Sequence, residues 1–368
     1  MLSLASTMSY RKTTTFLNRV RHESEGGTPL RTLADRVEKE GSRMRQVMDQ
    51  QAATLLREHQ FTDEGVPTTG QESYGLASSE ASLLQRDVLQ ALETYNRDKK
   101  ESYQIPPAAA DAFYENPNQT IQISVDDVGV KKQKASGRDS EKHRKESREY
   151  AHNTIAHVEK NKQSYIINGT GTLSVLRLVV AFLLHNQLLK NHYLQFFVDG
   201  ARTLHGAIGG LFAWLPHVRI ILDWYHLEKK CEYELSLVLK GSKIRNTVLD
   251  QLLPLLWLGQ IDKAAIYLNT LSTDFLKSGQ SVERLIGYFE RNRACIPCYA
   301  LRKQLGLRNS SNKGEKANDL CVATRQKHNG MSWSLDGSAS LATVTAMQIN
   351  GEHENWCVNR QIAFKIAS

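Results

Sequence analysis

The spacing of apolar residues changes near residue 118 of this 368-residue chain. Before that point, apolar residues recur at helical intervals or give way to loop-like composition. Beyond it, they alternate with polar residues, as on a half-buried β-strand, and the later strand-like runs are separated by apolar helical stretches. Helices that alternate with strands cover the faces of a sheet, so the pattern predicts an α/β fold. The predicted strands cover residues 120–130, 153–158, 163–167, 193–198 and 218–222.

Three strands followed by helix, strand, helix and strand is an order that resembles the RNase H-like fold. We therefore expect an RNase H-like mixed sheet, with a helical insertion between the fifth strand and the last acidic helix, and with a helical N-terminal region in front. The expected divisions are a helical region (1–60), a linker with a short helix (61–118), the first part of the core (119–230), the helical insertion (231–306), the last part of the core with the acidic helix (307–350) and a tail (351–368).

The N-terminal region is expected to hold two helices. Thr28-Pro29 is a typical helix start, because proline is tolerated in the first turn. Gly41-Ser42 is expected to interrupt the helix before a second one begins. Two helices with a short break are compatible with a helix-turn-helix that reads DNA, and equally with a helical hairpin that only packs.

Basic residues outnumber acidic ones, 47 to 39, and the formal net charge is +8. The excess is local: residues 129–148 hold eight Lys and Arg against three acids, and residues 300–330 hold seven against two. A charge run is by default a solvated surface. Because both runs lie beside candidate catalytic acids, where phosphates would approach, we expect them to contact a nucleic-acid backbone.

Several classes are excluded by what the sequence lacks. Its longest apolar stretches are far shorter than a membrane span, and its first residues hold no sustained apolar run of a secretory signal. The five cysteines are too few and scattered for a disulfide framework, and Cys295 and Cys298 form a CxxC without a second pair at zinc-site spacing. We interpret them as buried thiols and expect a cytoplasmic, nucleoid-associated protein.

Acidic residues interrupt the predicted strands at their ends. Asp126 and Asp127 lie late in the first strand, and Asp199 directly follows the fourth. A carboxylate beside a buried strand needs a partner, and a divalent cation suits several converging carboxylates. The alternative for Asp199 is ordinary turn chemistry, since Asp-Gly commonly ends a strand and Asp caps a following helix.

Two longer motifs surround these acids. Asp199-Gly200-Ala201 is followed by a predicted helix, a strand, and a closing aspartate and histidine. A second, charged helix carries a glutamate, an asparagine three residues later, and a basic tail that ends in glycine and tryptophan. Together these motifs resemble DDE transposases of the Mutator-like and related bacterial insertion-sequence groups. The remaining residues that carry the resemblance are Leu211-Phe212, Leu215-Pro216, Asp223, His226, Glu315, Asn318, Arg325, Lys327, Gly330 and Trp333.

The resemblance implies a specific chemistry. Asp126, Asp199 and Glu315 would be the catalytic and metal-binding acids, holding Mg²⁺ or, in its place, Mn²⁺. Water would cut a phosphodiester at the end of the element, and the freed 3′-OH would then attack target DNA. The implied partners are the terminal repeats of the element and the target DNA, bound by a homodimer or a larger oligomer.

Other residues receive supporting roles. Asp127 is the alternative first acid, and Asp223 is a rival for the second. His226, Asp223 and Asn318 are expected to support the metal-binding residues. The residues expected to contact DNA are Lys131, Lys132, Lys134, Arg325 and Lys327.

Two further functions stay open. The closing residues, 358–368, are not typical of the end of such a protein, so a catalytically inactive or truncated transposase-derived DNA-binding protein is one alternative. An RNase H-like nuclease of recombination or repair is the other, because it would share the acids. Products of strand transfer would distinguish the transposase from the nuclease.

Overall fold

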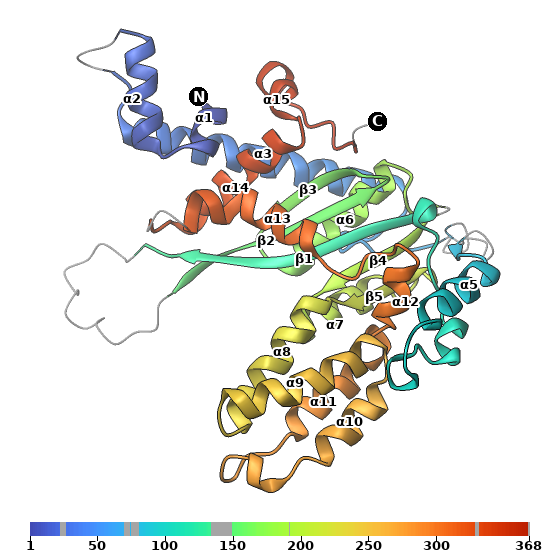
Figure 1. The fold of residues 1–368 in the computed structure, drawn as a ribbon. Helices are drawn as coiled ribbons and strands as arrows, with labels where there is room; N and C mark the ends of the chain where they lie inside the picture. Colours follow the sequence, from blue (N-terminus) through green and yellow to red (C-terminus); the bar gives the residue numbers. More distant parts are fainter. Residues whose placement is uncertain are drawn as a thin grey trace.

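The computed structural model describes residues 1–22, 27–69, 74, 81–133, 149–190, 192–327 and 331–366. Within these residues, five strands form one mixed sheet in the order β3-β2-β1-β4-β5 (Figure 1). β1 and β2 are antiparallel, as are β2 and β3, whereas β1, β4 and β5 run parallel. The strands are β1 (Thr120–Lys131), β2 (Tyr150–Lys160), β3 (Gln163–Gly169), β4 (Tyr193–Val198) and β5 (Val218–Leu222).

The strands confirm the α/β class predicted from the hydrophobic pattern. β4 and β5 have the predicted bounds, and β1 extends one residue further than predicted. β2 begins at Tyr150, three residues before its predicted start. Its early residues include an exposed tyrosine and histidine, which do not carry the apolar signal used to find it.

The sheet is covered mainly by two helices. α6 (Thr172–His185) and α14 (Leu335–Ile349) both pack on β2 and β3, and α3 (Leu30–Glu58) packs on both of these helices (Figure 1). Apolar side chains from these elements and the sheet form the largest hydrophobic core. The sequence pattern did not predict α14, because residues 338–347 are all buried and therefore show no polar face.

The N-terminal region is helical, as expected, with α1 (Leu2–Thr7) and α2 (Tyr10–Val20) ahead of α3. The predicted break at Gly41-Ser42 is wrong, because α3 continues through both residues. A Cβ at Gly41 would lie 2.4 Å from the Ser340 carbonyl oxygen, so glycine there permits a close approach between α3 and α14. The pair of helices expected for a helix-turn-helix around this break is therefore one continuous helix.

The predicted linker is also more ordered than its composition indicates. α5 (Gln85–Asn96) packs against α12 (Tyr299–Gln304), and the two share a small apolar core with Ile105 and Tyr114. Glu115 forms a fully buried, two-pronged ion pair with Arg302, at 2.7 and 2.5 Å. The described residues from 81 to 118 are thus fastened to the helical insertion.

The helical insertion projects beyond β5 and has its own apolar core (Figure 1). Beyond α12, the predicted acidic helix is divided into α13 (Asn312–Asn318) and a π-helical segment, Asp319–Lys327.

In the tail, Phe364 is buried against Phe182 and Tyr165. None of the described helices combines the length and apolar character needed to cross a membrane. The remaining helices are α7 (Arg202–Leu211), α8 (Trp224–Val238), α9 (Ser242–Trp257), α10 (Ile261–Asn269), α11 (Glu283–Arg291) and α15 (His353–Asn359).

Candidate active site

Two of the predicted acids lie at the same end of two adjacent parallel strands. β1 and β4 pair with Ser124 opposite Phe197, so Asp126 and Asp199 stand two residues further along each strand. Both side chains are partly buried. Burial, together with the nearby negative charge of Asp199, raises the pKa of Asp126. The charge of Asp199 is therefore close enough to Asp126 to affect its pKa.

The neighbouring carboxylates of β1 point in different directions. Successive side chains of a strand alternate between its two faces. Asp126 accepts a 2.6 Å hydrogen bond from the Asn318 side-chain amide, which is carried by α13. Asp127 is exposed, and its carboxylate instead accepts a hydrogen bond from the Thr154 hydroxyl on β2. Of the two, Asp126 is the acid that faces α13.

Glu315 is brought to the sheet by an unusually close contact between α13 and β1. A Cβ at Gly314 would lie 2.4 Å from the Ser124 Cβ, so a larger residue would push the helix away. Glu315 follows directly, and its side chain stays 40% exposed. Its Oε1 lies 3.9 Å from His226 Nδ1, which connects α13 to the start of α8. We call Asp126, Asp199 and Glu315 the acidic edge.

Asp223 has a different environment from these three acids. Its side chain is fully buried and caps α8 by accepting the His226 backbone N–H at 3.1 Å. Its other oxygen accepts hydrogen bonds from the Ser311 backbone N–H and, at 2.8 Å, from the Ser311 hydroxyl. Burial by itself would raise the pKa of Asp223, but the contacts with His226 and Ser311 outweigh burial and lower it. Asp223 thus ties the end of β5 to the start of α13, which carries Glu315.

His226 lies between the buried acid and the acidic edge. Its Nδ1 is 3.5 Å from Asp223 Oδ1, and the ring is 31% exposed. Contact with the Asp223 carboxylate raises the pKa of His226 against the opposing effect of burial, and the charges of Glu315 and Asp199 add to the increase. One ligand atom each from Asp223, His226 and Glu315 lies within 4.8 Å of the others. The sequence analysis placed His226 and Asp223 here in supporting roles.

Tyr288, a residue that the sequence analysis missed, also reaches this site from α11. Gly200 has a φ of +85°, and a Cβ at Gly200 would lie 2.4 Å from the Tyr288 hydroxyl oxygen. Burial raises the pKa of Tyr288, and the charge of Asp199 adds to the shift. No sequence signal identifies Tyr288, because its spacing on α11 is that of an ordinary core aromatic.

The site has free ligand atoms suited to a cation. Glu315 Oε1 and Asn318 Oδ1 are buried atoms without a hydrogen-bond partner. Unsatisfied buried acceptors are costly, and two of them beside neighbouring carboxylates fit a bound divalent ion. Oxygen donors predominate, which suits Mg²⁺ or Mn²⁺ better than a softer metal. Among the described residues, the donor atoms that lie close enough to share one ion are those of Asp223, His226 and Glu315, and not the predicted set of Asp126, Asp199 and Glu315. The charges of Asp126 and Asp199 act on His226, beside this group.

The predicted DNA-contacting residues have diverse environments. Lys131 and Lys327 are exposed, and Lys132 pairs with Glu149 at 2.5 Å. Lys134, with most of the basic run up to residue 148, lies outside the described residues. Arg325 corrects the expectation of a surface contact, because the residue is only 3% exposed. Its guanidinium is packed between two aromatic rings, so it is not part of an open basic surface.

No protein-family model, curated protein or solved structure matches this chain. The geometry of the site is accordingly the evidence on which a function can rest. It consists of two carboxylates at adjacent strand ends, a third on a helix pressed against the same strand, and a histidine between the third acid and a buried fourth.

Proposed function

We propose that the chain is a DDE transposase of a bacterial insertion sequence, which cleaves DNA and transfers the cut strand with the help of Mg²⁺. The observation that carries the proposal is that Asp126 and Asp199 lie beside each other on adjacent parallel strands, with Glu315 on a helix that packs against the strand of Asp126. These acids are far apart in the sequence, yet β1, β4 and α13 bring them to one end of the sheet. The strand order β3-β2-β1-β4-β5 supports an RNase H-like core, in which such acids would be held.

The residues of the acidic edge would hold the divalent ions. Bound Mg²⁺ would supply Lewis-acid stabilisation of the phosphoryl oxygens and of the attacking and leaving oxygens. Asn318 orients the Asp126 carboxylate by donating a hydrogen bond to it. Asp223 fixes the Ser311 end of α13, and the Glu315 N–H donates to the Ser311 carbonyl at 3.0 Å. These contacts preorganise the carboxylates before substrate arrives.

The surroundings of the acidic edge suit a large anionic substrate. Glu315 is open enough for a phosphodiester to reach it, whereas Tyr288 is buried and closes the Asp199 side. Lys131 and Lys327 are exposed on the same strand and helical run that carry Asp126 and Glu315. We propose that they contact DNA phosphates near the site, and that two or more copies of the chain assemble on the DNA ends.

The test is metal-dependent cleavage of DNA that carries the sequences flanking the gene. Wild type is compared with Asp199→Asn and with Asp127→Asn as the matched control, because each change removes one carboxylate charge and keeps the size. We expect nicked and joined products from wild type and Asp127→Asn, and neither from Asp199→Asn. Equal cleavage by Asp199→Asn would refute the assignment of the acids.

The same assay separates the two alternative functions. Nicking without joined products, in the presence of target DNA, would indicate a nuclease of recombination or repair. DNA binding without any cleavage by wild type would indicate a transposase-derived DNA-binding protein. Either result would replace the transposase proposal.

A further inference from the structure

Among the described residues, two arginines are almost completely removed from solvent, and they differ in their partners. Arg302 is fully buried and makes its two-pronged ion pair with Glu115. Arg325 is 3% exposed, and no carboxylate of the described residues lies within ion-pair distance of it. Its Nη2 has no hydrogen-bond partner, and burial lowers its pKa. A buried cation without an anion is costly, so the absent anion calls for an explanation.

The contacts that Arg325 does make hold the side chain in place without neutralising it. Nε donates to the Ala5 carbonyl at 3.2 Å, and Nη1 lies 3.8 Å from the Met331 sulfur. The guanidinium carbon lies 5.0 Å from the centre of the Tyr10 ring and 5.3 Å from that of Trp333. The ring faces offset part of the cost of burying the charge. They leave Nη2, a buried atom, without a hydrogen-bond acceptor.

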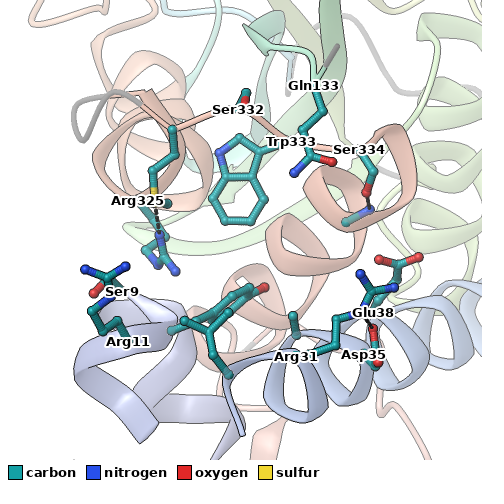
Figure 2. A pocket seen from close by; sticks show the side chains of 15 residues that line it. Ser9, Arg11, Arg31, Asp35, Glu38, Gln133, Arg325, Ser332, Trp333 and Ser334 are labelled. Carbon is teal, nitrogen blue, oxygen red and sulfur yellow. Dashed lines mark hydrogen bonds and ion pairs between the residues drawn. The ribbon is translucent and has the colours of Figure 1, made fainter. Parts of the chain in front are cut away.

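Arg325 lines a cavity of about 650 Å³ between the N-terminal helices and the segment that precedes α14. Figure 2 shows the guanidinium of Arg325 and the Trp333 ring on its wall, with α2 and α3 forming the opposite side. The volume lies within the range of small-ligand sites and exceeds what a free phosphate needs. We call it the Arg325 cavity.

The charges around the Arg325 cavity favour an anion near Arg325. Arg11, Arg31 and Arg325 line it, against Asp35 and Glu38. Asp35 is occupied by Arg31 at 2.9 Å, and Figure 2 places Glu38 across the cavity from Arg325. The lining arginines without a carboxylate partner among the described residues are therefore Arg11 and Arg325, so positive charge is in excess at the Arg325 end of the cavity.

We propose that the Arg325 cavity binds one nucleotide of single-stranded DNA, with its phosphate on Arg325 and its base against Trp333 and Tyr10. A guanidinium fork matches two phosphate oxygens, and aromatic rings stack on bases of any sequence. This inference rests on the proposed function, because it takes the substrate DNA as the source of the nucleotide.

The position of the cavity fits that substrate. Trp333 forms a β-bridge with Lys132, directly after the strand that carries Asp126, and Gln133 lines the cavity. Arg325 lies on the π-helical segment that continues from α13, ten residues beyond Glu315. Ten helical residues span roughly 15 Å, and the seven strand residues from Asp126 to Gln133 span roughly 23 Å. The bound nucleotide would therefore lie several positions from the cleaved phosphate.

The binding test uses no divalent metal, so its outcome does not depend on cleavage. Wild-type protein in EDTA is titrated with inorganic phosphate, with deoxyadenosine monophosphate and with a fluorescent 12-nucleotide single strand. We expect the nucleotide to bind at least tenfold more tightly than phosphate, because only the nucleotide has a base to stack. Equal affinities for phosphate and nucleotide would overturn the proposed stacking site, as would preferential binding of a hexaglutamate peptide.

Variants assign the binding to the cavity. Arg325→Met should weaken nucleotide binding at least tenfold while leaving the melting temperature unchanged or higher, because it removes an uncompensated buried charge. Trp333→Phe should weaken binding less, since a smaller ring still stacks. Lys263→Gln removes one positive charge from an exposed position of α10, in the helical insertion, so it is the control and should bind the mononucleotide as wild type does.

The outcomes separate this inference from the proposed function. Normal mononucleotide binding by Arg325→Met would overturn the inference, whether or not the wild type cleaves DNA. A marked fall in melting temperature, with binding retained by Arg325→Lys and Trp333→Leu, would show a purely structural arginine and would also overturn it. A third outcome is that wild type binds the nucleotide but never cleaves DNA, and that Arg325→Met loses this binding. That outcome would support nucleotide binding in the Arg325 cavity and would contradict only the transposase proposal.

Discussion

The acidic edge and the Glu115–Arg302 pair both place charged atoms in buried or partly buried positions, but they combine the charges in opposite ways. At Glu115–Arg302, opposite charges meet at 2.5 and 2.7 Å with neither side chain exposed. At the acidic edge, like charges converge, and buried atoms such as Glu315 Oε1 stay without a partner. Matched charge fastens the segment before β1 to the helical insertion. Neighbouring like charges do not stabilise the fold, and they are expected where a bound ligand supplies the opposite charge.

The largest effect should come from the acidic edge. Glu315→Gln removes one of three converging charges and should reduce DNA cleavage by roughly 10³-fold or more, since each cation contact contributes several kcal/mol to the transition state. The melting temperature should change little, because the Glu315 side chain is 40% exposed and its Oε1 makes no hydrogen bond. Single-turnover cleavage and thermal unfolding measure the two effects. A Glu315→Gln variant that is destabilised but still cleaves DNA would contradict this prediction, because Glu315 would then stabilise the fold and not the reaction.

The matched pair should behave in the opposite way. Arg302→Met leaves Glu115 buried without its partner and should lower the free energy of unfolding by about 3–5 kcal/mol. Adding Glu115→Leu should restore part of that loss, but not all of it, because Arg302 also donates to the Arg308 carbonyl. Urea unfolding of Arg302→Met, Glu115→Leu and the double variant gives the coupling free energy between the two side chains. Additive losses would show that the pair does not act as a unit.

A smaller, pH-dependent effect should come from His157 on β2, beside the ion pairs of Glu159 with Arg308 and Lys313. Burial lowers the pKa of His157 to about 4. The unfolded chain therefore takes up the proton first, so stability from neutral His157 is complete above about pH 6.5 and is lost as the pH falls toward 4.

That loss should reach roughly 2–3 kcal/mol, at about 1.4 kcal/mol per pKa unit. Urea unfolding at several pH values between 4 and 7.5, compared with His157→Gln, isolates it. The variant should show a shallower decline of the free energy of unfolding across this range. Identical slopes would indicate that folding does not shift the pKa of His157.

The smallest effect on stability should come from Tyr288, where the helical insertion meets the acidic edge. Its hydroxyl is buried without a hydrogen-bond partner, so Tyr288→Phe should raise the free energy of unfolding by about 1 kcal/mol. If the hydroxyl contacts the substrate or orients Asp199, cleavage should fall several-fold in the same variant. Unchanged cleavage would limit Tyr288 to packing against Gly200.

The strands and several residues of the site could be predicted because they depend on local patterns. The alternation of residues 120–130 and the apolar runs at 193–198 and 218–222 identified three strands closely. Acids at strand ends interrupt an apolar pattern, which made Asp126 and Asp199 visible. Glu315 was found through its resemblance to a known motif. By contrast, α14 is buried all round and shows no period, and Gly41 looked like a break because the partner it approaches is 299 residues away.

The sequence by itself determined the α/β class, the strand positions and the candidate acids. Hydrophobic periodicity and acids that interrupt an apolar strand can both be recognised from residues that are close together in the chain. Only the tertiary structure decided that Asp126, and not Asp127, faces α13, because a one-residue step turns a strand side chain to the other face. It also decided that Arg302 has an anion and Arg325 does not, and that Tyr288 reaches Gly200. These contacts join residues that are far apart in the chain. No local sequence pattern specifies which distant side chain will pair with a buried charge.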